Sequence, residues 1–164
     1  MKVLILAAHS DDETIGVGGT IARHIKMGDN VYGKYFTDGL SSRSKSKKID
    51  ICERERAAIS ASNILGFEWL DRGDFPDNML DTVPLIEIIR EIEKIKNLIN
   101  PQIIYTHSPS DLNIDHRIIA EATITAFRPK SSENFEEIRL YEVPSSTDYS
   151  HSSINQSFNP NLFI

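Results

Sequence analysis

A continuous apolar run near the start of the chain, VLILAA at positions 3–8, most constrains what this sequence can fold into. A strand with one face in water alternates apolar and polar side chains, and this run has no polar face. Such a run is typical of a strand that is buried on both faces of a parallel sheet. The sequence therefore predicts an α/β fold in which helices cover both sides of the sheet.

The rest of the chain alternates strand and helix signals as this fold requires. Strands are predicted over 3–8, 30–37, 67–71, 102–107 and 138–143. Helices are predicted over 14–27 and 49–65, from a cap at Asp81 or Thr82 to Ile99, and from the stretch 108–117 to just before Pro129, with a mobile basic loop over 41–48. This order favours a Rossmann-like three-layer sandwich with a mostly parallel sheet in the order 3-2-1-4-5. We expect one domain over residues 1–164.

Charge and composition argue against several classes of protein. A formal net charge of −6 and a pI of about 5.3 argue against a general nucleic-acid binder. No segment approaches the roughly 18 apolar residues of a membrane span, and the apolar start meets DDE too early for an export signal. A single cysteine, Cys52, suits a reducing compartment. We expect a soluble, cytoplasmic protein, which can be either a monomer or a homo-oligomer.

The stretch AAHSDDETIGVGG at positions 7–19 places a histidine and three consecutive acids where the first strand should end. Neighbouring carboxylates repel one another and are costly to desolvate. One explanation is a solvated helix start, since the helix dipole favours acids there. The other is a bound cation.

A second group of histidine and aspartate favours the cation. In the order 3-2-1-4-5 the first and fourth strands are neighbours, and ligands bind beyond their carboxyl ends. His9 follows the first strand, and the fourth strand ends near His107 and leads into Asp115 and His116. Two imidazoles and one carboxylate with an open fourth position form a catalytic zinc site, and His9, Asp12 and His116 supply them. Asp11, beside the metal, is then a candidate general base, and Asp115 is a further candidate catalytic residue.

These residues resemble the PIG-L/LmbE-like zinc-dependent N-deacetylases. The resemblance rests on A-H-S-D-D-E, a glycine-rich helix start and a distal D-H, and it extends to about residue 148. The stretches FPDN (75–78), YTHSPSDLNIDHR (105–117) and YEVPSST (141–147) look like a bacterial branch of the family. The resemblance implies zinc, or another divalent metal, held by His9, Asp12 and His116, with Asp11 as the base. It implies an N-acetylated sugar or sugar conjugate as substrate, and a chain that is C-terminally incomplete relative to the family.

One position departs from the family pattern. The distal motif is often H-x-D-H, whose first histidine polarises the carbonyl and protonates the leaving amine, and here that position is Asn113. An amide can donate a hydrogen bond to an oxyanion but cannot act as an acid. His107 is an alternative acid, although a hydrogen-bonded structural role suits it as well. Asn113 is equally compatible with an ordinary helix N-cap.

Two further residues are predicted to contact the substrate. Arg54 precedes a helix end, as a substrate-contacting arginine does in relatives, although a surface ion pair explains it equally well. Asp77 in FPDN can bind a sugar hydroxyl or form a turn.

The sequence thus favours a metal-dependent hydrolase that removes an acetyl group from an N-acetylated amino sugar. The first alternative is a metal-binding but catalytically weak sugar-recognition module. The second is a nucleotide-binding α/β protein, suggested by the glycines at 16–19. That alternative lacks support because the G-x-G-x-x-G pattern needs glycine where Ile21 stands.

Overall fold

The computed structural model describes residues 1–42, 48–131, 134–150 and 157–164, with the backbone alone for residues 48–51. Its elements are β1 (Lys2–Ala7), α1 (Asp12–Lys26), β2 (Asn30–Tyr35), α2 (Lys48–Leu65), β3 (Glu68–Trp69), the 3₁₀ helix η1 (Leu80–Thr82), α3 (Leu85–Ile99), β4 (Ile103–His107), α4 (Ile114–Ala126) and β5 (Glu137–Tyr141). The middle of the basic loop predicted over 41–48 lies outside the described residues.

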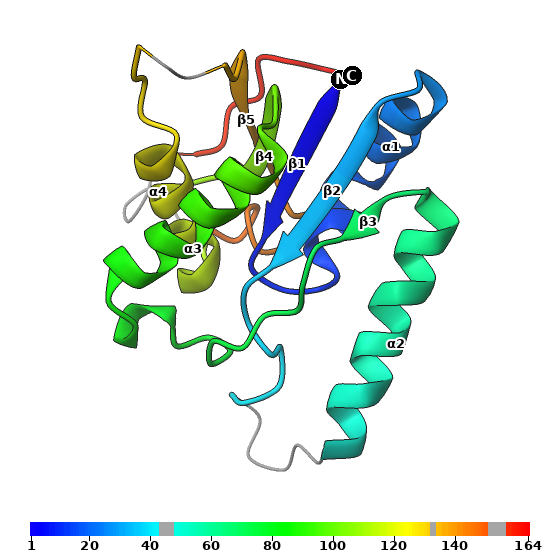
Figure 1. Cartoon of the computed structure of the whole chain (residues 1–164). Helices are drawn as coiled ribbons and strands as arrows, with labels where there is room; N and C mark the ends of the chain where they lie inside the picture. The colour runs from blue at the N-terminus through cyan, green and yellow to red at the C-terminus, as the bar shows by residue number, and fades with distance from the viewer. Residues whose placement is uncertain (43–47, 132–133, 151–156) are drawn as a thin grey trace.

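The five strands form one parallel sheet in the order β3-β2-β1-β4-β5, which confirms the predicted topology (Figure 1). β1 lies in the middle, and its side chains alternate between two apolar clusters. Leu4 and Leu6 point into one cluster, and Val3 and Ile5 point into the other. The apolar run therefore lacks a polar face because neither of its faces meets water.

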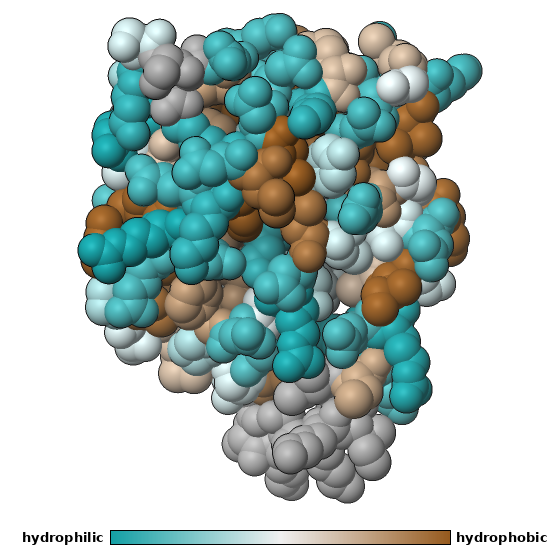
Figure 2. Space-filling view, viewed as in Figure 1, coloured by the Kyte–Doolittle hydropathy of each residue, from teal (hydrophilic) through white to brown (hydrophobic). Residues whose placement is uncertain are grey.

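Helices cover both faces of the sheet and complete three layers. The isoleucines of α3 and the small side chains of α4 pack against one face. Val17 and Ile21 of α1 pack against the other face, with Leu65 of α2 beside them. Figure 2 shows hydrophilic residues over most of the visible surface, with hydrophobic residues in separate groups. No helix in the described part of the chain is long and apolar enough to cross a membrane.

Two predicted helix starts differ from the structure. α1 begins at Asp12 rather than at Thr14. The predicted cap of α3 at Asp81 or Thr82 is wrong, because these residues form η1 and Pro84 is the N-cap of α3. A residue before proline is disfavoured from helical conformation, and Val83 is extended, so the helix cannot begin earlier.

The chain reverses its direction of winding between β1 and β4, which are directly paired through Ile5 and Tyr105. α1 and α2 lie on one side of this point, and α3 and α4 on the other. Loops leaving two neighbouring strands on opposite faces open a crevice between them. The fold therefore places its crevice beyond Ala7 and His107.

Candidate metal centre

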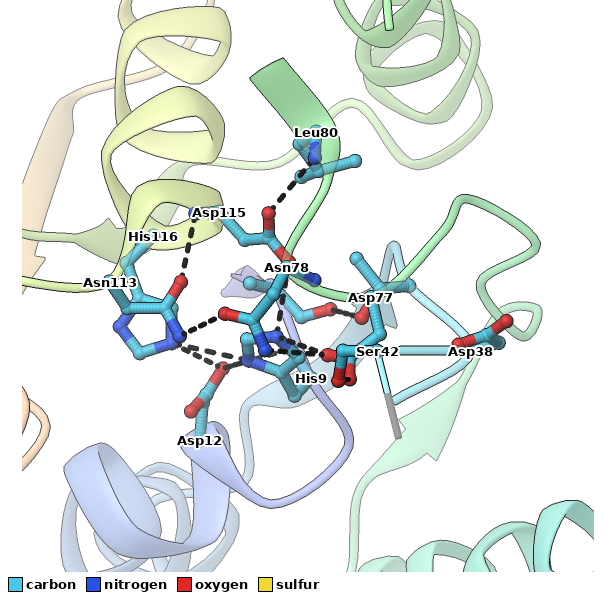
Figure 3. A network of polar contacts seen from close by, with 12 residues as sticks. His9, Asp12, Asp38, Ser42, Asp77, Asn78, Leu80, Asn113, Asp115 and His116 are labelled. Atoms are coloured by element: carbon cyan, nitrogen blue, oxygen red, sulfur yellow. Dashed lines mark hydrogen bonds and ion pairs between the residues drawn. The ribbon is translucent and has the colours of Figure 1, made fainter. Parts of the chain in front are cut away.

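The predicted site residues come together in this crevice (Figure 3). His9 follows β1, Asp12 begins α1, and His116 lies in the first turn of α4. These three, together with Asp11, Arg54, Asp77 and Asn113, line a cavity of about 270 Å³. Asp115 contacts His9 from behind the cavity wall, and His107 contacts Asp12.

Three ligand atoms lie at nearly equal separations in the cavity. His9 Nδ1 and His116 Nε2 lie 3.1 and 3.2 Å from Asp12 Oδ2, and the two ring nitrogens are 3.2 Å apart. All three residues are buried. Ligand atoms around a tetrahedral zinc ion at about 2.0–2.1 Å lie roughly 3.4 Å from one another. The donor set and its spacing therefore fit a divalent cation such as zinc.

Each histidine of this group turns its other ring nitrogen toward a carboxylate. His116 Nδ1 is 3.1 Å from Asp111 Oδ2. His9 Nε2 is 3.1 Å from Asp77 Oδ1 and 3.2 Å from Asp115 Oδ2. A carboxylate accepts the N–H of an imidazole, which leaves the lone pair of the opposite nitrogen facing the cavity.

His9, Asp77 and Asp115 also form a group with metal-ligand spacing. A neutral imidazole has a single lone pair, so His9 can bind a metal on only one side. The Asp115 carboxylate also accepts the backbone N–H groups of Asn78, at 2.7 Å, and Leu80, at 3.1 Å. We therefore assign this second group to the support of His9 and of the segment before α3.

The surrounding carboxylates give the site a high affinity for positive charge. Burial lowers the pKa of His9, but hydrogen bonds to carboxylates, Asp115 first, outweigh it and raise the pKa to about 11. Burial also lowers the pKa of His116, but hydrogen bonds to Asp111 and Asp12 outweigh it and raise the pKa to about 9. Both shifts show that the carboxylates make the surroundings of the two imidazoles strongly negative, which favours a positive charge between them.

The three consecutive acids have three different surroundings. Asp12 is in the ligand group. The Asp11 side chain is 53% exposed at the cavity, and its Oδ2 lies 3.0 Å from an amino group of Arg54. Glu13 is fully buried and accepts a hydrogen bond from the Thr14 hydroxyl, and burial raises its pKa to about 7. Of the three acids, Asp11 has the only exposed side chain at the cavity.

His107 is embedded behind the ligand group. It is fully buried, its ring stacks on that of His116 at 3.9 Å, and its Nε2 accepts the Ala8 N–H at 2.8 Å. Burial first, and then the charge of His116, lower the pKa of His107 to about 4. A neutral, hydrogen-bonded structural residue fits these contacts, and a role as the catalytic acid stays a prediction.

Asn113 is the N-cap of α4, as one reading of the sequence proposed. Its Oδ1 accepts the Asp115 N–H at 2.8 Å. Its Nδ2 lies on the side of the amide that faces the cavity, and it donates to Asn78 Oδ1 at 3.2 Å (Figure 3). The cap therefore leaves the amide donor available to the site.

Sequence reasoning missed three residues of the site. Asp111 accepts hydrogen bonds from Ser146 and Thr147 as well as facing His116, and Asn78 and Ser146 line the cavity. A metal-bound histidine normally has a carboxylate behind it, and that rule could have found Asp111 in the quoted DLNIDH. Asn78 has a positive φ of 54°, a backbone conformation that asparagine adopts more often than most residues, and the turn-forming residues of FPDN are a local signal for it.

The two residues predicted to contact the substrate differ in how many protein contacts their side chains already make. Arg54 lines the cavity and contacts Asp11. Asp77 lines the cavity too, but one of its oxygens faces His9 and the other accepts the Ser42 hydroxyl. A substrate contact by either residue stays a prediction.

Comparison with known proteins identifies the family of the chain. Residues 4–127 match the family described as PIG-L: GlcNAc-PI de-N-acetylase. The curated "Uncharacterized deacetylase YaiS" of Escherichia coli (strain K12) is 28% identical over 148 residues, which are 87% of this chain and 74% of that protein.

Two solved structures show the same fold. The N,N'-diacetylchitobiose deacetylase from Pyrococcus horikoshii is 25% identical with a TM-score of 0.70, over 87% of this chain and 61% of that chain. The 4-carboxy-2-hydroxymuconate hydratase GalB from Pseudomonas putida KT2440 is 21% identical with a TM-score of 0.63, over 76% of this chain and 55% of that chain. This chain thus spans less than two thirds of both solved structures.

The hydratase shows that the fold alone does not determine the reaction. The family match is more specific, because it spans most of the chain and includes the ligand group, Asp11 and Asn113. It confirms the resemblance drawn from the sequence. The chain belongs to the PIG-L (GlcNAc-PI de-N-acetylase) family.

Proposed function

We propose that this chain is a zinc-dependent hydrolase that removes the acetyl group from an N-acetylated amino sugar or its conjugate. The observation that carries the proposal is the ligand group of His9, Asp12 and His116, with the Asp11 carboxylate and the Asn113 amide at the same cavity. The names of the family and of the P. horikoshii relative refer to acetylated amino sugars, which supports this substrate class.

Each group has one role in the proposed reaction. Zinc held by the ligand group would polarise the acetyl carbonyl and lower the pKa of water. Asp11 accepts a proton from the water whose oxygen bonds to the carbonyl carbon, and Asn113 Nδ2 donates a hydrogen bond to the resulting oxyanion. When the C–N bond breaks, Asp11 returns the proton to the departing amine, and acetate remains.

We assign the return of the proton to Asp11 rather than to His107. His107 is fully buried, and its Nε2 already accepts the Ala8 N–H. Asp11 is half exposed at the cavity and reaches the same space as the Asn113 amide. One carboxylate acting first as base and then as acid compensates for the missing histidine at position 113.

Acetate release from a panel of N-acetylhexosamine conjugates tests the proposal. The metal-free protein should be inactive, and added zinc should restore activity at one ion per chain. Asp11→Asn keeps the shape of the side chain but cannot take a proton, so turnover should fall by about 100-fold or more while the zinc content stays unchanged. Equal loss of zinc and activity in this variant would make Asp11 a metal ligand instead.

The same experiment separates the alternatives. Stoichiometric zinc and sugar binding without acetate release would contradict the hydrolase and favour a sugar-recognition module. Binding of a dinucleotide by the metal-free protein would favour the nucleotide-binding alternative.

A further inference from the structure

Gly39 and Arg54 are in direct contact at the wall of the cavity. Gly39 has a φ of 67°, and a Cβ built on it would lie 2.5 Å from Arg54 Nε and 3.0 Å from Arg54 Cζ. Real Cβ atoms do not approach other atoms so closely. The guanidinium group of Arg54 therefore occupies space that exists because residue 39 has no side chain.

The turn that carries Gly39 is held in place on both sides. The Asp38 carboxylate accepts the backbone N–H groups of Leu40 and Ser41, each at 2.9 Å. The backbone N–H of Asp38 donates to Phe75 O at 2.9 Å. Arg54 thus rests on a fixed stretch of backbone.

From this position Arg54 reaches Asp11. Its terminal NH2 group lies 3.0 Å from Asp11 Oδ2, and within the described residues this is the one polar contact of the Asp11 side chain. Arg54 Nε is buried and has no hydrogen-bond partner among the described residues, so it adds no competing contact that would fix the guanidinium elsewhere. The direction of the half-exposed Asp11 carboxylate therefore depends on Arg54.

We propose that Gly39 and Arg54 are positioning residues for Asp11: Gly39 leaves the space that Arg54 fills, and Arg54 aims the Asp11 carboxylate at the cavity. The proposal rests on the proposed function, in which Asp11 moves the proton. Proton transfer requires the carboxylate within hydrogen-bond reach of the water, and a displacement of about 1 Å can lower a rate by about 100-fold. Because Arg54 acts through Asp11, its substitution should lower kcat and leave KM unchanged.

A double-mutant cycle tests the action of Arg54. Arg54→Ala should lower kcat by about 10- to 100-fold with unchanged KM and zinc content, and added guanidinium ion should restore part of the loss. In an Asp11→Asn background the same substitution should have no further effect. A rise in KM that persists in that background would overturn the proposal and make Arg54 a substrate contact. Arg56→Ala, which removes an exposed arginine of the same helix, is the matched control.

A second cycle tests Gly39. Gly39→Ala should lower kcat because the new methyl group displaces the guanidinium group. In an Arg54→Ala background it should lower kcat no further, since no guanidinium group is left to displace. An equal loss of kcat in both backgrounds would show backbone strain instead, and would overturn the role of Gly39.

Crystal structures of the Gly39→Ala and Arg54→Ala proteins test the same contact without any assay. In both, the Asp11 carboxylate should turn away from its place in the parent protein, with the ligand group unmoved. If Asp11 stays in place in both, the positioning proposal fails even when the parent protein releases acetate. If the parent protein releases no acetate, the proposed function fails, and these structures still decide whether Gly39 and Arg54 direct Asp11.

Discussion

The side chain of Asn113 uses the two ends of one amide group for different purposes. Its oxygen caps α4 by accepting the Asp115 N–H, and its nitrogen is turned to the cavity. Serine is as good an N-cap as asparagine, but it has no amide donor. Folding and catalysis can therefore be separated at this one position.

Asn113→Ser should keep the cap and remove the amide donor. We expect the free energy of unfolding to change little, and kcat to fall by about 100- to 1,000-fold, the usual cost of losing an oxyanion donor. Asn113→Ala should lower kcat equally and also lower the stability by about 1 kcal/mol. Urea denaturation and acetate release measure the two effects, and full activity in the serine variant would remove Asn113 from the site.

Asp111 should control metal affinity from behind His116. Asp111→Asn can still accept a hydrogen bond, but it removes the charge that favours the N–H at His116 Nδ1. We expect the zinc affinity to fall by about 10- to 100-fold in competition with a chelator. Asp81→Asn, on the exposed side of η1, is the control, and equal affinities for the two variants would contradict this role.

The convergence of His9, Asp12 and His116 could be predicted from the sequence, whereas their surroundings could not. His9, Asp12 and His116 follow strand ends or begin helices, and the strand order brings such positions together. Asn78 enters the site because its backbone is left-handed and its N–H is held by Asp115. The contact with Asp115 joins segments that are distant in the sequence, and no local pattern records it.

At the scale of elements, strand runs are easier to predict than helix starts. The apolar central strands β1 and β4 carry a local signature of burial on both faces, and the mixed runs at 30–37, 67–71 and 138–143 are recognised by their β-branched and aromatic residues. The start of α3 depended on Pro84, whose effect on Val83 outweighed the capping preference of Asp81 and Thr82. The glycines at 16–19 have a packing reason at Gly16, where a Cβ would lie 2.7 Å from Tyr141.

The loops after β2 and β3 pack so closely that one of them requires glycine. A Cβ on Gly73 would lie 2.1 Å from the carbonyl carbon of Phe36. Gly73→Ala should push the loops apart and lower the free energy of unfolding by about 1–3 kcal/mol in urea denaturation. A Cβ on Gly19 in α1 would have no atom within 4 Å, so Gly19→Ala should raise the free energy of unfolding by about 0.5–1 kcal/mol. A Gly73→Ala protein as stable as its parent would show that the loops can separate at no cost.

At the scale of the whole molecule, the three proposed metal ligands come from both halves of the fold. His9 and Asp12 belong to the β1–α1 side and His116 to the β4–α4 side, so an ion held by all three links both halves. The single domain over residues 1–164, the cytoplasmic location and the homo-oligomer stay predictions.

Zinc should therefore stabilise the folded chain as a whole. At a free concentration of about 100 times Kd, an ion that binds only the folded state adds about 2.7 kcal/mol, or roughly 5–10 °C in Tm for a chain of this size. Differential scanning calorimetry with zinc and with chelator measures the shift. Asp12→Ala should abolish it, and an undiminished shift in that variant would place the ion elsewhere.

The hydrogen bonds around the ligand atoms have a consequence for metal choice. Asp12 Oδ2 accepts the backbone N–H of His9 at 2.9 Å. Carboxylates also contact His9 Nε2 and His116 Nδ1, the ring nitrogens that face away from the cavity. Protein groups therefore set the spacing of the three candidate ligand atoms. A preorganised site loses little conformational entropy on binding and adapts poorly to a larger ion. Calcium, which takes six to eight oxygens at 2.3–2.6 Å, should therefore bind weakly to two imidazoles and one carboxylate. Cobalt, which accepts imidazole and carboxylate at similar distances, should replace zinc more readily than nickel, which prefers square-planar or octahedral geometry.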